Sequence, residues 1–373
     1  MNPTLALEVP FLDLKAQYRV LAPEIKDAVG DVLESAQFVG GPYVENFEQE
    51  FASYIGARYA VGVSSGTSAL ELALKVAGIG PGDEVLVPAN TFFATAEAVS
   101  NVGASPVFTD VDATSFHLDV NSAERMITSR TRAIIPVHLY GRAMDLRRTA
   151  EFADAYHLRI IEDAAQAHGS AYNGAKVGAA GRLTCFSFYP GKNLGAYGDA
   201  GAVTTNDYGE AHRLRLLRDH GSPAKYQHSV IGTNARLDSI QAAILSIKLC
   251  QLDQWNQLRR KHAARMASAL ADSPVVPPEI PIDGEHVFHL FVVRTPQRNA
   301  LRRYVRANGI GSGIHYPVPL HLTEAYQQLG YPGKNSLPVA EQVAEEILSL
   351  PMYAELTDEQ IEYTIDTILN FAG

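Results

Sequence analysis

Short apolar runs alternate with amphipathic stretches through the first two thirds of the chain. The amphipathic stretches repeat apolar residues every three or four positions, as at Val44, Phe47, Phe51 and Tyr54, which is the spacing of one helix face. Strands that alternate with helices indicate an α/β fold with a mostly parallel sheet covered by helices. The apolar runs predict strands at residues 59–63, 84–87, 106–109, 133–137, 159–161, 183–188 and 202–204.

The pattern changes after a long helical stretch that begins near Asp238 and continues beyond Trp255. A proline-rich loop follows at residues 273–278. Because 373 residues exceed a comfortable single core, we expect a large domain (1–250) and a smaller C-terminal α/β domain (251–373). In the smaller domain the pattern predicts strands at 287–293 and 311–315, and helices at 298–308, 339–348 and 357–371.

The composition argues against several classes of protein. The net charge is -10 and the pI is about 5.6, whereas general binders of nucleic acid or membrane surfaces need a basic field. Cys185 and Cys250 form no Cys-x-x-Cys, so no disulfide framework and no metal site is expected. Residues 1–10 lack the features of a signal peptide, and no later segment is apolar and long enough to cross a bilayer. We therefore expect a soluble, cytoplasmic protein.

A turn rich in Ser, Gly and Thr follows the first predicted strand and leads into an Ala/Leu-rich helix. Free amides and the positive end of the helix dipole at Gly66, Thr67 and Ser68 would bind a phosphate. The turn has neither the Gly-Lys-Ser/Thr of a Walker loop nor the three glycines of a dinucleotide fingerprint. A plain Ser/Thr helix cap explains the turn equally well when it is considered alone.

Two charged residues follow later strands. Lys192 lies in a Pro/Gly turn after residues 183–188, and Asp163 lies just past residues 159–161. A lysine amine can hold pyridoxal phosphate (PLP) as a Schiff base, and an aspartate beside the pyridine nitrogen keeps that nitrogen protonated. Taken singly, the two residues are explained as a solvated charge and a helix cap. Since ligands bind at the carboxyl ends of strands, where Gly66 also falls, the three elements together predict a PLP site.

With these elements in place, the chain resembles the DegT/DnrJ/EryC1/StrS family, PLP-dependent aminotransferases that act on nucleotide-linked keto sugars. The resemblance extends from residues 10–14 to at least 315–317 and includes Phe-Ser-Phe-Tyr-Pro-Gly-Lys-Asn at 186–193. It implies aminotransferase fold type I and a homodimer with shared active sites. Within the family, this run with Tyr189 resembles the branch that aminates carbon 3 of the hexose. Enzymes that aminate carbon 4 more often carry His at the position of Tyr189. Ser68 occupies a position where many relatives have Asp. This difference affects only the detail of the phosphate loop and removes no catalytic group.

The resemblance implies a role for each residue of the cofactor site. Lys192 would be the Schiff-base lysine, Asp163 the partner of the pyridine nitrogen, and Gln166 the partner of the phenolic oxygen. Phe92 matches the aromatic residue that stacks on the ring, although core packing is the commonest fate of such a residue. The phosphate would be held by Gly66, Thr67, Ser68 and Ser187, joined by Asn234 from the other subunit.

The candidates for binding the sugar nucleotide lie beside the lysine and in two later turns. Lys225 and Arg236 could offset the diphosphate charge. His138 and His168 also match family positions, but we expect each to be a satisfied core histidine and neither to ligate a metal. The candidate substrate contacts are Tyr189, Lys225, Tyr226, His315 and Tyr316, for which a solvated loop or packing at the domain junction is the alternative.

The implied reaction is a transamination in two halves, with glutamate as the amino donor. The favoured product is dTDP-3-amino-3,6-dideoxyhexose, formed from the dTDP-linked 3-keto-6-deoxyhexose for a lipopolysaccharide or another glycan. A UDP-linked 3-keto sugar, a 4-keto sugar and a non-catalytic regulator stay open. A PLP-dependent dehydratase is disfavoured because relatives that dehydrate have His in place of Lys192. A nicotinamide-dependent epimerase or reductase would need a Gly-rich dinucleotide turn and a Tyr-x-x-x-Lys pair, and neither is evident.

Overall fold

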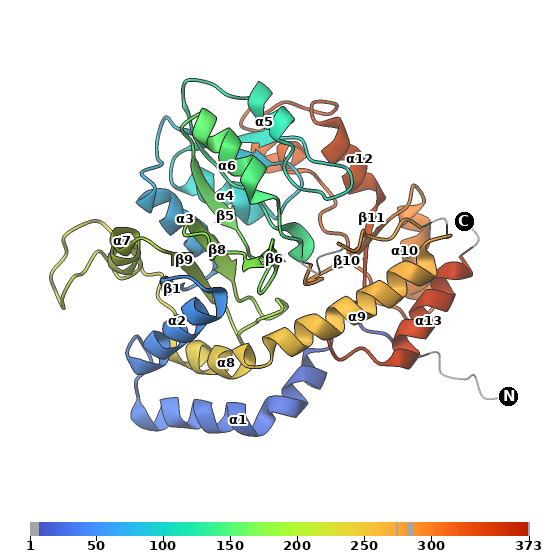
Figure 1. Ribbon diagram of the computed structural model, residues 1–373, viewed down its shortest axis with the longest axis horizontal. Helices are drawn as coiled ribbons and strands as arrows, with labels where there is room; N and C mark the ends of the chain where they lie inside the picture. The colour runs from blue at the N-terminus through green and yellow to red at the C-terminus, as the bar shows by residue number, and fades with distance from the viewer. Residues whose placement is uncertain (1–6, 274, 282–285, 372–373) are drawn as a thin grey trace.

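The computed structural model of the chain describes residues 7–273, 275–281 and 286–371. Its centre is a seven-stranded sheet of order β1-β9-β8-β5-β4-β2-β3 (Figure 1). Every neighbouring pair is parallel except the two pairs that contain β9. The predicted α/β fold with a mostly parallel sheet is therefore confirmed. The strands are β1 (Tyr59–Val63), β2 (Glu84–Pro88), β3 (Ser105–Thr109), β4 (Thr131–Ile134), β5 (Arg159–Asp163), β8 (Leu183–Ser187) and β9 (Gly201–Thr205), with a separate hairpin of β6 (Ala171–Tyr172) and β7 (Ala175–Lys176).

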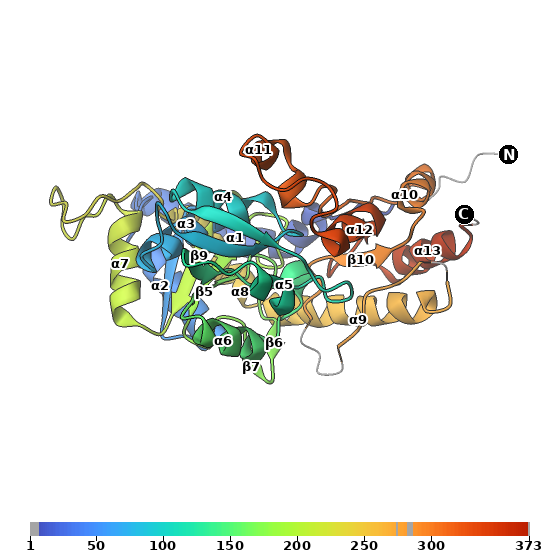
Figure 2. The same cartoon turned by 90° about the horizontal axis from the view of Figure 1, so that it is seen from above.

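Helices cover both faces of the sheet, as the view from above shows (Figure 2). In β2, Val85 and Val87 pack in one apolar cluster and Leu86 in another, because successive side chains of a strand point to opposite faces. One face is covered by α3, α4 and α7, and the other by α2, α6 and α8. The helices of this part are α1 (Leu14–Ser35), α2 (Pro42–Ile55), α3 (Gly66–Val76), α4 (Phe93–Asn101), α5 (Val120–Arg125), α6 (Leu146–Ala155), α7 (Tyr208–Arg218) and α8 (Ser239–Leu249).

The C-terminal part has an apolar cluster of its own. The long helix α9 (Leu252–Leu270) leads from the sheet toward it (Figure 1). There β10 (Phe291–Arg294) pairs antiparallel with β11 (Ile347–Leu350). Val9, near the other end of the chain, packs in the same cluster. The remaining helices are α10 (Arg298–Ala307), α11 (Glu324–Gln327), α12 (Pro338–Glu346) and α13 (Asp358–Leu369).

Four predicted elements of the later chain differ from the structure. The strand predicted at 287–293 begins only at Phe291. The strand predicted at 311–315 is absent, because its backbone forms only isolated bridges: Gly311 N donates to Val9 O, and Gly313 exchanges two hydrogen bonds with Ser349. The helix predicted at 339–348 ends at Glu346, because the apolar residues that follow pair with β10. The long helix predicted from Asp238 is divided into α8 and α9.

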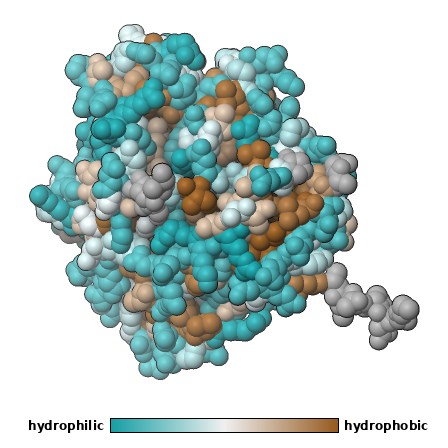
Figure 3. All heavy atoms as spheres, turned by 45° about the vertical axis from the view of Figure 1, so that its right-hand side comes forward, coloured by the Kyte–Doolittle hydropathy of each residue, from teal (hydrophilic) through white to brown (hydrophobic). Residues whose placement is uncertain are grey.

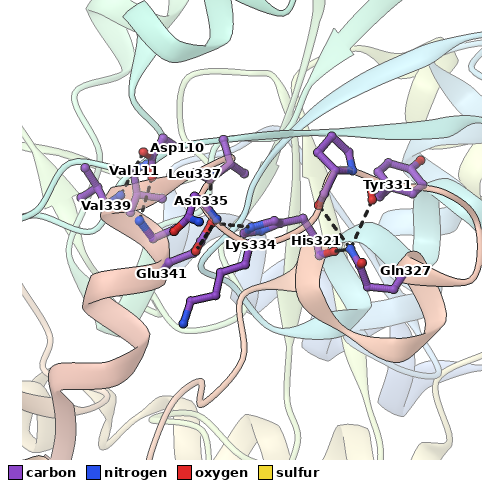
Figure 4. A network of polar contacts seen from close by, with 12 residues as sticks. Asp110, Val111, His321, Gln327, Tyr331, Lys334, Asn335, Leu337, Val339 and Glu341 are labelled. Atoms are coloured by element: carbon purple, nitrogen blue, oxygen red, sulfur yellow. Dashed lines mark hydrogen bonds and ion pairs between the residues drawn. The ribbon is translucent and has the colours of Figure 1, made fainter.

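Polar contacts tie α12 to the end of β3 (Figure 4). The buried carboxylate of Asp110 accepts hydrogen bonds from two amides in the first turn of α12, at 3.1 and 2.7 Å. Glu341, in the same first turn of α12, accepts from the amide of Asn335 at 2.8 Å and pairs with Nε2 of His321 at 3.2 Å. These contacts hold the loop that precedes α12 against the sheet.

The face drawn in Figure 3 is largely hydrophilic, with smaller hydrophobic areas between the polar side chains. Among the described residues, no helix combines the length and the apolar character needed to cross a bilayer. Of the N-terminal stretch considered for a signal peptide, residues 1–6 lie outside the described residues.

Candidate active site

A cavity of about 610 Å³ lies at the carboxyl ends of the central strands. The chain segments that follow β1, β5 and β8 all contribute to its wall, as expected for a ligand site in an open α/β sheet. Residues from the C-terminal part close the wall from the other side, among them His315 and Met352. The predicted site residues that line this cavity are Gly66, Thr67, Phe92, Asp163, Gln166, Ser187, Tyr189, Lys192, His315 and Tyr316.

Lys192 lies in a tight loop after β8. Its amide donates to the carbonyl of Tyr189 at 2.8 Å, and a side chain at Gly195 would clash with Pro190. Burial lowers the pKa of the Lys192 amine from 10.5 to about 8, although the charge of Asp163 acts in the opposite direction. At pH 7.5 about a quarter of such amines are neutral, against about one in a thousand for an ordinary lysine. The amine can therefore act as a nucleophile or a base near neutral pH.

Asp163 is the last residue of β5, and its side chain is buried. Both carboxylate oxygens have donors: Thr95 Oγ1 lies 2.8 Å from Oδ2, and the amide of Ala165 lies 3.1 Å from Oδ1. These two contacts fix the orientation of the carboxylate in the cavity wall. Burial and, to a smaller extent, the charge of Asp163 raise the pKa of Tyr316, and the same charge partly offsets the effect of burial on the pKa of Lys192.

The helix α3 begins in the cavity wall. Ser65 is its N-cap, and the Ser65 hydroxyl accepts from the amide of Ser68 at 3.0 Å. The hydroxyl of Ser68 lies 2.9 Å from that of Ser64 and 3.0 Å from that of Ser65. Ser68 thus belongs to the cap, and it does not line the cavity as Gly66 and Thr67 do.

Gly66 lies against Ser187 at the end of β8. A Cβ atom at Gly66 would stand 2.6 Å from the Cβ atom of Ser187, so this close approach requires glycine. The first amides of an α-helix have no acceptor within the helix. Those of Gly66 and Thr67, with the hydroxyl of Ser187, therefore form a concave set of donors suited to a phosphate.

Two aromatic residues and a glutamine form another part of the wall. Gln166 Oε1 accepts from the amide of Tyr140 at 2.6 Å, and Gln166 Nε2 donates to the Tyr316 hydroxyl at 3.1 Å. The rings of Phe92 and Tyr316 lie 5.6 Å apart at an angle of 40°. Phe92 is 54% exposed, so core packing is wrong as an explanation of this residue.

Three of the predicted residues lie away from the cavity of their own chain. Lys225, Tyr226 and Asn234 belong to the loop between α7 and α8, which extends away from the body of the protein in both ribbon views (Figures 1 and 2). Tyr226 is 85% exposed, and Asn234 is exposed. Contact of Lys225 and Tyr226 with substrate therefore stays a prediction, since this loop points away from the cavity of its own chain.

A model of the DegT/DnrJ/EryC1/StrS aminotransferase family matches residues 20–369. The chain belongs to this family. A pleiotropic regulatory protein of Geobacillus stearothermophilus is 46% identical over 98% of this chain and 99% of its own length. The dTDP-3-amino-3,4,6-trideoxy-alpha-D-glucose transaminase of Streptomyces venezuelae is 49% identical over 98% and 96%.

The solved structures agree with this assignment. The S. venezuelae protein DesV in complex with a ketimine intermediate has a TM-score of 0.95, 49% identity and 97% coverage of both chains. Similar folds have been solved with bound cofactor PMP and in a PLP-form. This member of the family is therefore a PLP-dependent aminotransferase.

Several cavity residues of the aminotransferase were not predicted. Phe11 stacks on His315 with ring centroids 5.7 Å apart, and His289 lines the cavity near Lys192. Thr95, which does not line the cavity itself, was not predicted as a site residue either, although its hydroxyl donates to the Asp163 carboxylate. The available signal for Thr95 was a hydroxyl on an apolar helix, and His289 lies in an apolar strand pattern where a polar residue is unusual.

The histidines of the aminotransferase have separate roles. His138 is a satisfied core residue: Nε2 lies 3.1 Å from Glu162 Oε2, and Nδ1 accepts from the amide of Met144 at 3.0 Å. His168 is fully buried between aromatic rings, and burial lowers its pKa to about 3. His315 lines the cavity with Nδ1 2.8 Å from the Ser349 hydroxyl, and burial lowers its pKa to about 4.

Proposed function

We propose that this aminotransferase moves an amino group from glutamate to carbon 3 of a dTDP-linked 3-keto-6-deoxyhexose, forming a dTDP-3-amino-3,6-dideoxyhexose. The observation that carries the proposal is a lysine amine with a pKa of about 8 in the same cavity as the buried Asp163 carboxylate. The S. venezuelae relative, which carries the name of a 3-amino sugar transaminase, supports the choice of substrate.

The residues of the cavity fit PLP in size and in chemistry. A volume of about 610 Å³ lies within the usual range of small-molecule sites. The donors at Gly66, Thr67 and Ser187 suit the phosphate, Asp163 suits the pyridine nitrogen, and Lys192 suits the aldehyde. Bound PLP supplies an electron sink through which an amino group can pass between two carbonyl compounds.

The chain itself supplies the proton transfers and the environment. The neutral Lys192 amine would take a proton from the substrate carbon that carries the amino group and deliver it to the cofactor. With PLP bound, the Asp163 carboxylate would supply a fixed negative charge to the pyridine nitrogen. The apolar side chains of Leu12, Phe92 and Met352 line the cavity and limit the access of water to the reacting atoms.

We propose a symmetric homodimer in which Asn234, Lys225 and Tyr226 complete the partner's cavity. Support comes from the outward loop between α7 and α8, on which Tyr226 is 85% and Ile231 96% exposed. Apolar side chains exposed in this way are typical of an interaction surface, and a two-fold axis would place each loop against the other chain.

We further propose two domains, residues 1–250 and 251–373, and a cytoplasmic location. The separate apolar cluster around β10 and β11 supports the division, with Val9 as an N-terminal residue that packs on the second unit. Two unpaired cysteines suit a reducing compartment.

Tyr189 is our candidate for contact with the sugar, because it is 60% exposed and lines the cavity. A role as a regulator is the second candidate, since the Geobacillus relative carries that name. The intact pair of Lys192 and Asp163 favours catalysis. A UDP-linked 3-keto sugar and a 4-keto sugar are the alternative substrates for this cavity.

The deciding experiment incubates the protein with glutamate and a panel of dTDP- and UDP-linked 3-keto and 4-keto sugars. NMR of the product then locates the new amine. We expect amination at carbon 3 of the dTDP-linked 6-deoxy sugar and double-displacement kinetics. Sequential kinetics, or no amination of any sugar in the panel, would refute the proposal.

A further inference from the structure

Asn193, the residue after Lys192, is buried in a hydrogen-bonded arrangement that leaves its amide group one orientation. Its Nδ2 donates to Asn256 Oδ1 and to the carbonyl of Val287, both at 2.9 Å. Asn256 is fixed in turn, because its own Nδ2 donates to the carbonyl of His168 at 2.8 Å. The Oδ1 atom of Asn193 is therefore left as an acceptor.

That acceptor determines the tautomer of His289. Nδ1 of His289 lies 3.2 Å from Asn193 Oδ1, and an amide oxygen can only accept. Nδ1 must then carry a hydrogen. Burial, with the charges of Lys192 and Arg259, lowers the pKa of His289 well below its ordinary value. The ring is neutral at physiological pH, so Nε2 carries a lone pair and no hydrogen.

His289 lines the same cavity as Lys192 and is half-buried. We propose that His289 is a further substrate-binding residue, whose bare Nε2 accepts a hydrogen bond from an N–H or O–H group of the substrate next to Lys192. The inference rests on the proposed function, because it assumes that the substrate occupies this cavity. The donor is a sugar hydroxyl or the nitrogen of the amino acid, and the experiment below separates these two sources.

An acceptor with so weak a basicity does not take the proton that moves in the reaction. That task stays with Lys192, whose pKa of about 8 suits it. Loss of the His289 acceptor should therefore raise KM and Kd for one substrate and leave the pH profile of kcat in place.

Two substitutions separate the two ring nitrogens. In His289→Asn the short amide reaches the position of Nδ1, so the contact with Asn193 can be kept while the acceptor is lost. In His289→Gln the longer amide reaches the position of Nε2, so an acceptor is kept. Matched readouts are the cofactor absorbance and the melting temperature, which show that each variant is folded and loaded.

Binding to the holoenzyme is measured by calorimetry with dTDP-glucose and with dTDP, and KM for glutamate is measured in the first half-reaction. We expect His289→Asn to weaken one substrate about tenfold, with His289→Gln near the wild type. A change for dTDP-glucose but not dTDP identifies a sugar hydroxyl, and a change for glutamate identifies the amino acid. Unchanged affinities in His289→Asn, or equal losses in both variants, would overturn the proposal.

A measurement on the wild type covers the case in which a variant does not fold. Nitrogen-15 NMR of the histidine side chains should show His289 with hydrogen on Nδ1 and none on Nε2, and the Nε2 signal should move when substrate is added. Hydrogen on Nε2, or a signal that substrate leaves unmoved, would overturn the proposal. A wild type that aminates no sugar would instead refute the proposed function, while the tautomer of His289 would stand.

Discussion

Thr95 Oγ1 donates a hydrogen bond of 2.8 Å to Oδ2 of Asp163, joining the first turn of α4 to the end of β5. The same hydroxyl lies 3.0 Å from that of Thr91. Since Thr95 uses its only hydrogen on the carboxylate, Thr91 must be the donor of the second contact. The Oδ2 side of the Asp163 carboxylate is thus held by two hydroxyl groups in series, those of Thr95 and Thr91.

Replacement of Thr95 by Val keeps the shape of the side chain and removes this donor. A hydrogen bond to a charged group contributes about 1.5–3 kcal/mol, so we expect PLP to bind about 10- to 100-fold more weakly. The dissociation constant can be measured by titrating the cofactor-free protein and following absorbance. Thr95→Ser keeps a hydroxyl and is the matched control, and equal affinities in Thr95→Val and the wild type would contradict the role of Thr95.

The pKa of Lys192 predicts how the first half-reaction depends on pH. A lysine with a pKa lowered to about 8 loses its proton as pH rises through that value, and only the neutral amine can accept a proton from substrate. The rate should therefore rise between pH 6.5 and 9 with a midpoint near 8. Single-turnover absorbance with glutamate measures this profile. A rate that is flat over the whole interval would contradict the assignment of Lys192 as the base.

Two glycines give opposite predictions for the same substitution. Gly66→Ala would place a Cβ atom 2.6 Å from that of Ser187, and overpacking of this kind costs about 1–3 kcal/mol. We expect weaker cofactor binding, because the helix start must move away from the phosphate site.

Gly30→Ala in α1 has no atom within 4 Å of the new Cβ and should stabilise the fold by about 0.4–1 kcal/mol. Cofactor titration and chemical denaturation test the pair, and normal PLP affinity in Gly66→Ala would argue against the proposed cradle.

The contacts at the start of α12 predict that removing the Asp110 carboxylate lowers the free energy of unfolding and leaves the cavity in place. Asp110→Ala removes the acceptor for two amides at the start of this helix (Figure 4). Loss of such a cap costs about 0.5–2 kcal/mol, which urea denaturation should detect. Lys334→Ala is the control, because this side chain is 71% exposed and its pair with Glu345 is 3.9 Å long. Equal losses in the two variants would show that the cap contributes nothing.

Much of the fold and the centre of the site were accessible from local sequence patterns. The strands of the main sheet are short apolar runs between turn residues. Asp163 is the last residue of one of these strands, and Lys192 lies in the loop that follows another. The boundary between α12 and β11 was not accessible, because its apolar residues suit either structure until β10 is present. The same applies to contacts between distant residues. Thr95 meets Asp163 across 68 positions, and His289 meets Asn193 across 96, so no local pattern connects them.

The proposed sharing of sites predicts complementation between two inactive chains. Lys192→Ala removes the reactive amine, and Asn234→Asp would set a negative charge against the phosphate in the partner's cavity. Each variant alone should be inactive. In a dimer with one chain of each kind, one cavity has Lys192 and the partner's intact Asn234, so it should work.

Unfolding and refolding the two variants together in equal amounts should make half of the dimers mixed, each with one good site of two. The expected activity is about a quarter of the wild type, measured after size-exclusion chromatography confirms the dimer. Each variant refolded alone is the control. The mixture could instead be as inactive as its components while both variants still form dimers. Asn234 would then contribute to the cavity of its own chain or to neither cavity, and the cavity would be complete without the partner's loop.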